Sequence, residues 1–527
     1  MDQSWGEDMD NFGWITILDL ELNPPNLKDN TADVDRLIKA IGKSLNQKQI
    51  TIDLKFARKL PYILRDLDYS VRVYLSNVGT GIHIIDLGAK RNQPEAYGIA
   101  IDIGTTTLVM ALIDLKTLSI LKETQAHNPQ IEVGSDILTR IHFASSEMGL
   151  ERLKEMLLGA LNEMVTTLAK EAGINTSQIL CASMAGNTTM THFLLGLTPY
   201  WIIREPYIPA MNKFEILRAK EIGLNICPEA PCFVFPNVGS YFGGDLIAGI
   251  LTSGIYESDD ICVLVDVGTN AEVVIGNRDW LVACAGAAGP ALEGGVASVG
   301  MMAQKGAIDS FYIDPNTFNF QYTTIGGIPP KGICGSGLID LVSQLFLRGM
   351  LDQRGKLVPS TLKERYLKID NIPHLLIEKE GQDGRPLLLG QPEIDALMRS
   401  KAAMFTILTT LFKTVGISPL DIQKFFVAGT FGSYIKPYAA IVLGMIPDLP
   451  LEKYVTLGNS SLGGAKRVLE DPLLCEKANE IRDKIMYLEL NVNQEFMNLF
   501  NAAKFIPHTD MSLFPTVKEL LENAFHH

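Results

Sequence analysis

Clusters of basic residues are scarce in this chain, and their scarcity excludes a class of partners. The 527 residues contain 46 lysines and arginines against 60 aspartates and glutamates, which gives a formal net charge of −14. A protein that binds DNA or RNA needs a concentrated basic surface to neutralise phosphates, and no such cluster is visible in the sequence. We therefore expect no nucleic-acid partner and no attraction to an anionic membrane.

Long apolar runs are also missing. No apolar run reaches the roughly 18 residues that a membrane-spanning helix needs. The first eight residues are acidic and contain no apolar segment of the kind found in secretory signals. The sequence therefore predicts a cytoplasmic protein without a membrane partner.

Cysteines are few and scattered. Of the seven, only Cys227 and Cys232 are close in the sequence, with C-x4-C spacing. A disulfide scaffold needs a paired framework, a plant-type iron–sulfur loop needs a third cysteine three residues further on, and zinc–thiolate sites need closer pairs. We therefore expect no iron–sulfur cluster and no metal–thiolate site on this chain.

The length predicts two or more domains, because one hydrophobic core stops growing well below this size. Residues 1–13 are acidic and contain glycine, which predicts a disordered terminus or an expression remnant, and the terminal histidine pair suggests a tag. Residues 14–95 read as strand, helix, helix, strand and strand, a small α+β domain that ends in a polar linker.

A strand ending in aspartate, a glycine turn and a returning strand occur twice. The first copy joins strands over 98–103 and 108–113, and the second joins strands over 262–267 and 271–275. An internal repeat of this kind predicts two homologous lobes that face each other. The expected segments are a first lobe at 97–258, a second lobe at 259–465 and a C-terminal segment at 466–527 that packs back on the lobes.

Glycine turns of this type handle phosphate, since glycine allows close backbone approach while N–H and threonine hydroxyl groups donate hydrogen bonds. Asp102 and Asp266 at the strand ends are expected to hold Mg²⁺, partly through water. One such turn alone is usually a plain hairpin, but two would clamp a polyphosphate, with a third glycine turn behind the nucleoside. The expected contacts are Gly104, Thr105, Thr106 and Thr107 in the first turn, Gly268, Thr269 and Asn270 in the second, and Gly429, Thr430 and Gly432 in the third.

Two further features stay open. Gly335 and Ser336 open a predicted helix whose N-terminus could cradle nucleotide, or they could simply bend the chain. Asp245 lies in a Gly-Gly-Asp segment just ahead of the second lobe. It is our candidate catalytic carboxylate, with a plain helix N-cap as the alternative.

The three turns, in this order, resemble the phosphate-1, phosphate-2 and adenosine motifs of the actin/Hsp70/sugar-kinase ATPase superfamily. The resemblance implies an α/β fold with duplicated, ribonuclease H-like ATPase lobes, preceded by the small α+β domain. The segment 241–249 is similar to the superfamily's first connecting helix, which implies that Asp245 orients or deprotonates a nucleophile at the γ-phosphate.

A closer resemblance spans about 14–515, to the reductive activators of corrinoid proteins. Residues 30–37 resemble that family's linker and middle domain, which we place together in 14–95. The other motifs that carry the resemblance are Asn128-Pro129-Gln130, Gly134-Ser135-Asp136, Arg140-Ile141, Gly186-Asn187-Thr188-Thr189-Met190, Ala288–Gly294, Cys334–Asp340, Ala428–Ser433 and Leu457–Ala465.

This family resemblance implies an ATPase that returns the Co(II) of a methyltransferase system's corrinoid protein to Co(I), with ATP and Mg²⁺ as cofactors. Family members usually carry an iron–sulfur domain, so either this chain is a fragment or a separate ferredoxin supplies electrons. Three alternative functions stay open: a small-molecule (polyol or sugar) kinase with Asp245 as base, a nucleotide-gated scaffold, and a dehydratase activator. The chain could also form a homodimer.

Overall fold

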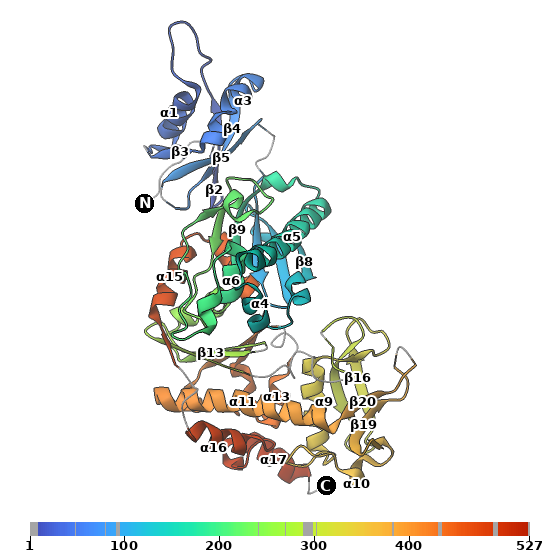
Figure 1. Ribbon diagram of the computed structural model, residues 1–527. Helices are drawn as coiled ribbons and strands as arrows, with labels where there is room; N and C mark the ends of the chain where they lie inside the picture. Colours follow the sequence, from blue (N-terminus) through green and yellow to red (C-terminus); the bar gives the residue numbers. More distant parts are fainter. Residues whose placement is uncertain are drawn as a thin grey trace. The chain divides into compact units, whose positions relative to one another are not determined.

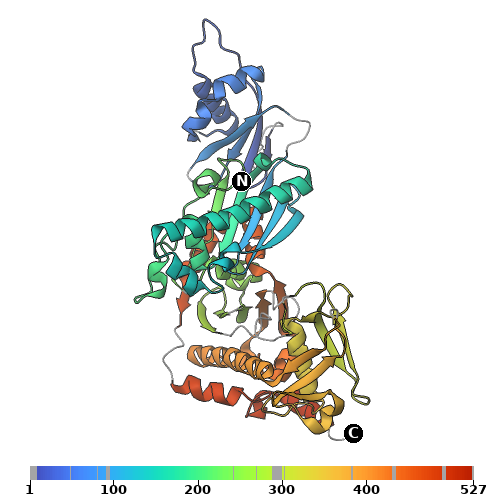
Figure 2. The same ribbon diagram turned by 45° about the vertical axis from the view of Figure 1, so that its right-hand side comes forward.

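The computed structural model forms two compact units, drawn in Figures 1 and 2. The first consists of Met1–Thr252 and Ser461–Asp483, and the second of Ser253–Ser460 and Lys484–His527. The structure describes residues 9–47, 49–79, 81–90, 95–240, 242–268, 270–287, 299–301, 303–381, 384–429, 435–488 and 494–524.

The first unit begins with a small α+β domain, as the sequence predicts. Its five-stranded sheet has the order β1-β2-β4-β5-β3, and one face of the sheet packs its alternating apolar residues against the helices. The strands are β1 (Met9–Asn11), β2 (Ile15–Glu21), β3 (Ile50–Ile52), β4 (Ser70–Ser76) and β5 (Ile82–Gly88), and the helices are α1 (Asp33–Leu45), α2 (Leu54–Ala57) and α3 (Leu60–Asp66).

The expectation of a disordered segment over 1–13 is wrong for its last residues. Met9–Asn11 forms β1, which pairs antiparallel with β2. Trp14, directly after this segment, is fully buried, and its indole N–H donates to the carbonyl of Val468 at 2.7 Å. A buried tryptophan with a satisfied N–H fixes the chain that precedes it, so the domain begins earlier than composition suggests.

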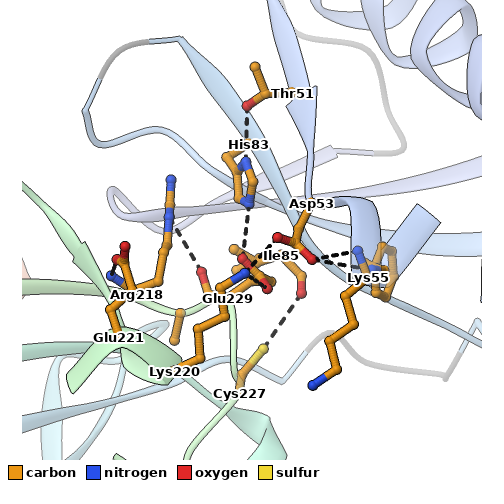
Figure 3. Close-up of polar contacts among 12 residues, drawn as sticks. Thr51, Asp53, Lys55, His83, Ile85, Arg218, Lys220, Glu221, Cys227 and Glu229 are labelled. Atoms are coloured by element: carbon orange, nitrogen blue, oxygen red, sulfur yellow. Dashed lines mark hydrogen bonds and ion pairs between the residues drawn. The ribbon is translucent and has the colours of Figure 1, made fainter. Parts of the chain in front are cut away.

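A polar cluster joins this domain to the next sheet of the same unit (Figure 3). Lys220 Nζ lies 2.6 Å from both Asp53 Oδ2 and Glu229 Oε1. His83 on β5 lies between the hydroxyl of Thr51, at 2.9 Å, and the carboxylate of Glu229, at 3.4 Å. The Glu229 side chain at the centre of this cluster is only 8% exposed, whereas Lys220 and Asp53 still reach solvent. The cluster is therefore a partly buried contact between the two sheets.

The second sheet of the first unit has six strands in the order β10-β11-β9-β6-β7-β8. Long apolar strands and capped helices build it. Ser146 caps the start of helix α5 (Glu147–Ala172) by accepting from Gly149 N, and the left-handed Gly173 caps its end. Its strands are β6 (Tyr97–Ile103), β7 (Thr107–Asp114), β8 (Ser119–His127), β9 (Ile179–Gly186), β10 (Leu217–Arg218) and β11 (Pro231–Val234). Its helices are η1 (Pro129–Glu132), α4 (Ile137–Phe143), α5 (Glu147–Ala172), α6 (Thr188–Leu195), α7 (Ala219–Ile222) and α8 (Gly244–Ser253).

The main sheet of the second unit repeats this arrangement in the order β22-β21-β12-β13-β14-β23. In both sheets the first three strands of the repeat are antiparallel, and the fourth pairs parallel with the first. The predicted duplication of ribonuclease H-like lobes is therefore confirmed. The strands are β12 (Cys262–Val267), β13 (Asn270–Gly276), β14 (Leu281–Ala287), β21 (Lys424–Ala428), β22 (Tyr454–Gly458) and β23 (Ile485–Tyr487).

Helices and two small sheets complete the second unit. The long helix α11 packs on β13 and β14 and lies beside α16, as Figures 1 and 2 both show. The helices are α9 (Gly335–Leu347), α10 (Pro359–Leu362), α11 (Gln391–Val415), α13 (Pro437–Leu443), α16 (Gln494–Ala503) and α17 (Pro515–Ala524). The small sheets are β15 (Ala307–Ile313) with β16 (Phe320–Thr324) and β17 (Gly332–Ile333), and β18 (Tyr366–Ile369) with β19 (Ile372–Glu378) and β20 (Leu387–Gly390).

The expected C-terminal segment 466–527 is divided between the two units. Helices α14 (Ser460–Glu470) and α15 (Leu474–Lys484) pack with the first unit. A Cβ on Gly464 would lie 2.3 Å from the carbonyl oxygen of Ala248 in α8, so only glycine allows this approach. The remainder stays with the second unit, where buried Lys401 of α11 donates to the carbonyl of Pro507 at 2.7 Å.

Candidate functional site

The first predicted phosphate turn links β6 to β7. A Cβ on Gly104 would lie 2.4 Å from the carbonyl oxygen of Thr107, so the turn is too tight for any other residue. Asp102, at the end of β6, and the turn residues as far as Thr107 are half-buried. This part of the predicted site is therefore assembled at one edge of the sheet.

Two buried side chains hold the carbonyl groups of this turn. Asn128 Nδ2 donates to the Gly104 oxygen at 3.0 Å, and the Asn128 backbone N–H donates to the Thr106 oxygen at 2.8 Å. Arg140 of α4 donates through Nη1 to the Thr105 oxygen at 2.8 Å. Both residues belong to motifs that carry the family resemblance, but the sequence predicted neither as part of the site. Neither their spacing nor their residue type shows that they reach the turn.

Asn187 connects the turn with the segment that carries Asp245. Its Nδ2 donates to the Thr105 hydroxyl at 3.0 Å, and its Oδ1 accepts from Met190 N to cap α6. A Cβ on Gly243 would fall 2.2 Å from Asn187 Cα and 2.7 Å from Asp245 Oδ1. The structure therefore brings Asp245, at the start of α8, into the neighbourhood of the first turn.

Asp102 meets a residue from the far end of the chain. The Ser461 hydroxyl, at the start of α14, donates to Asp102 Oδ1 at 2.8 Å. Ser461 was not among the predicted site residues, although it lies in the Ser-Ser-Leu-Gly-Gly motif. Its hydrogen bond stabilises the ionised carboxylate in one orientation.

In the second unit, the second and third motifs meet. Asp266 of β12 lies opposite Ala428 of the parallel strand β21. A Cβ on Gly429, whose φ is +84°, would lie 2.7 Å from Asp266 Oδ1. Gly268 follows β12 directly; Thr269, Thr430 and Gly432 lie outside the described residues, and Asn270 is described only through its backbone.

Gly335 and Ser336 open α9, as predicted, and this helix end packs tightly. A Cβ on Gly337 would lie 2.2 Å from the Ile308 carbonyl oxygen on β15. Asp340, one turn further on, is buried and accepts from Phe311 N and Lys436 Nζ, each at 2.7 Å. These contacts fix the N-terminal end of α9 on β15.

The cysteines are packing residues. Six of them are buried and Cys475 is half-buried, and all seven are free thiols. Burial raises the pKa of Cys227 and of Cys284 to about 12, so their thiols stay protonated and poorly nucleophilic. Within the described part of the chain, no group of three or more histidine, cysteine or acidic residues could hold a metal ion, and no helix is both long and apolar enough to cross a membrane.

Comparison with known proteins identifies the family to which this chain belongs. Three family models match consecutive segments: "RACo linker region" at 14–93, "RACo middle region" at 97–258 and "C-terminal domain of RACo the ASKHA domain" at 260–518. A solved structure titled "Reductive activator for corrinoid,iron-sulfur protein" is 37% identical, covers 98% of this chain and 82% of its own, and superposes with a TM-score of 0.88. The chain belongs to the RACo family.

Two curated relatives extend the comparison. The "Corrinoid activation enzyme RamQ" of Eubacterium limosum is 29% identical over 85% of this chain and 79% of its own length. The "[Co(II) methylated amine-specific corrinoid protein] reductase" of Methanosarcina barkeri is 23% identical over 77% of this chain and 76% of its own length. RACo membership favours an activation enzyme over the kinase and scaffold alternatives.

The family models also correct one assignment. We expected linker and middle domain together in 14–95, but the linker model covers 14–93 alone. The middle region matches 97–258, the segment that holds the first repeat of the duplicated lobes. The error arose because the polar stretch before residue 97 resembles a boundary after a complete domain rather than one after a linker.

Proposed function

We propose that this RACo-family chain uses ATP to reactivate the corrinoid protein of a methyltransferase system, returning its Co(II) to Co(I). The observation that carries this proposal is the near full-length match to a corrinoid activator at 37% identity. One electron per cobalt is needed, and an iron–sulfur domain or a ferredoxin-type protein outside this sequence supplies it.

Mg²⁺ and ATP fit the residues present. The Gly104 turn leaves no room for a Cβ, so its backbone can approach a phosphate closely. Asp102 in the first unit and Asp266 in the second are half-buried carboxylates at strand ends, a type of ligand that Mg²⁺ accepts directly or through water. When bound, the ion would neutralise part of the phosphate charge.

Within this proposal the site residues have distinct roles. Thr105, through its hydroxyl and backbone, binds phosphate, while Asn187 keeps that hydroxyl in place. Asp245 orients or deprotonates the water that attacks the terminal phosphate, which makes the chain an ATPase. Hydrolysis can assist an uphill electron transfer only if the nucleotide states bind the corrinoid protein differently.

An anaerobic reduction assay tests the function. The chain is mixed with a Co(II) corrinoid protein, Mg·ATP and a mild reductant, with and without an added ferredoxin domain, while the Co(I) absorption band is followed. We expect Co(I) only when both ATP and the ferredoxin domain are present. Co(I) formed without the ferredoxin domain would overturn the electron route. Binding of the corrinoid protein, measured in parallel by calorimetry, should depend on the nucleotide, and nucleotide-independent binding would overturn the activator assignment.

A further inference from the structure

A positive charge lies buried behind the first phosphate turn without a negative partner. Arg140 is fully buried, and its guanidinium donates to the carbonyls of Gly134 and Thr105, each at 2.8 Å. Its other contacts are the Gln130 amide oxygen at 3.4 Å and Met190 Sδ at 3.9 Å. All of these partners are neutral, and across the described residues neither an ion pair nor a partner for Nη2 is found.

The nearest acidic side chain in the sequence, the α4 N-cap Asp136, makes no ion pair with this guanidinium. The Asp136 carboxylate caps α4 by accepting from the backbone N–H of Thr139 at 2.9 Å and from its hydroxyl at 2.7 Å. Burial lowers the pKa of Arg140, opposed only by the charge of Asp136. Burying an uncompensated charge is costly, so Arg140 carries an electrostatic cost at this position in the absence of a ligand.

The same guanidinium controls the direction of a peptide group in the turn. A trans peptide holds its C=O and N–H on opposite sides. Because Arg140 binds the Thr105 oxygen, the N–H of Thr106 points away from the buried side. Asn128 binds the Gly104 oxygen and so turns the N–H of Thr105 in the same sense.

The Asn128 and Arg140 side chains act together on this turn. Asn128 Nδ2 and Arg140 Nη1 both contact Met190 Sδ, at 3.8 and 3.9 Å. For the N–H groups of Thr105 and Thr106, no backbone acceptor is found in the part of the chain that the structure describes. Successive N–H groups presented on one side form an anion-binding concavity.

We propose that Arg140, supported by Asn128, is a positioning residue for phosphate: it aims the Thr105 and Thr106 N–H groups outward and places behind them a positive charge that a bound anion would offset. The ligand class is the polyphosphate of a nucleotide, so this role presupposes the proposed nucleotide site. Arg140 need not touch the phosphate, since a buried charge acts over several ångströms with little screening by salt.

The test compares full-length variants by calorimetry with Mg·ATP and with magnesium pyrophosphate as the probes. We expect Arg140→Gln to lower the affinity for both ligands by roughly 10- to 100-fold, the range for losing one buried charge interaction. Arg140→Lys keeps the charge and should bind both at least about fivefold more tightly than Arg140→Gln. The matched control Arg152→Gln removes an exposed arginine of α5, 63% exposed, and should bind like the wild type.

A second pair of variants keeps the test valid if Arg140→Gln misfolds. Asn128→Asp gives the guanidinium an internal counter-ion beside Met190 but also removes the amide donor to the Gly104 oxygen, whereas Asn128→Leu removes only that donor. We therefore expect Asn128→Asp to lose more affinity for pyrophosphate than Asn128→Leu, and equal losses would overturn the charge role. Wild-type affinity in Arg140→Gln, or equal losses in Arg140→Gln and Arg140→Lys, would overturn the charge role. Failure of the wild type to bind ATP at all would overturn the proposed function instead.

Discussion

The hydroxyl of Ser461 donates to the carboxylate of Asp102 at 2.8 Å, although 359 positions separate the two residues in the chain. The contact joins the start of α14 to the end of β6 within the first unit. It holds a proposed Mg²⁺-organising carboxylate in one orientation before any ligand arrives, and such preorganisation lowers the cost of binding.

Removing either strand-end carboxylate should impair nucleotide binding. We expect Asp102→Ala and Asp266→Ala each to lower the affinity for Mg·ATP by roughly 10- to 100-fold, because a charge-assisted contact is lost. Ser461→Ala should lower this affinity by only about a few-fold, since the carboxylate remains. Calorimetry and the ATP-dependent shift in melting temperature measure these effects, and Asp279→Ala, at a side chain that is 77% exposed, is the control. Unchanged affinity in both aspartate variants would remove these residues from the site.

Asp245 should affect chemistry more than binding. We expect Asp245→Asn to leave ATP affinity nearly unchanged and to lower the hydrolysis rate by roughly 10²- to 10⁴-fold, the usual contribution of a positioned acid–base group. Phosphate release under saturating ATP measures the rate. If affinity falls instead, the residue has a structural role at the start of α8.

The polar cluster between the N-terminal domain and the adjacent sheet should contribute to stability through Lys220. Replacing this lysine by methionine leaves the Glu229 carboxylate buried without its ammonium partner, so we expect a loss of about 1–3 kcal/mol in the free energy of unfolding. The double variant Lys220→Met/Glu229→Gln should recover part of that loss. Urea unfolding measures both, with exposed Lys170→Met as the control. A separate Glu229→Gln variant completes the cycle, and full additivity of the two single changes would show that the pair is not coupled.

The stability of the same polar cluster should depend on pH through His83. Burial lowers the pKa of this imidazole below its usual 6.5, helped by Arg218 and Lys220 and opposed by Glu229. The unfolded chain therefore binds the proton more readily, and stability present above about pH 6.5 should be lost as the pH falls below that value. His83→Gln should flatten this part of the profile. The difference between wild-type and variant unfolding curves from pH 7.5 to 5 isolates the effect, and parallel curves would contradict it.

Much of the fold was predictable because the repeat leaves a local signal. Each copy places an apolar strand, an aspartate and a glycine turn in a fixed order, so the strands that begin both six-stranded sheets could be predicted from adjacent residues. The Gly463-Gly464 pair was visible too, but only the structure shows that Gly464 is required by the close approach of α14 to Ala248.

The parts that sequence missed depend on contacts between distant segments. Arg140 lies in an ordinary helical pattern, and nothing near it in sequence reveals that it is fully buried beside Thr105. Ser461 follows a strand of the second unit, so its position in the chain suggested the wrong unit. Long-range pairings of this kind are fixed by packing rather than by local propensity.

The division of the first unit between two stretches of chain governs how the protein can be dissected. Because Ser461–Asp483 completes that unit, a fragment ending at Thr252 would leave the indole N–H of Trp14 without its Val468 acceptor and uncover the Ala248 face of α8. A self-sufficient version would require α14 and α15 to be spliced after α8 through a designed loop. Conversely, a separately synthesised peptide spanning these two helices should bind the truncated fragment and restore it, so the unit can serve as a split-protein reporter.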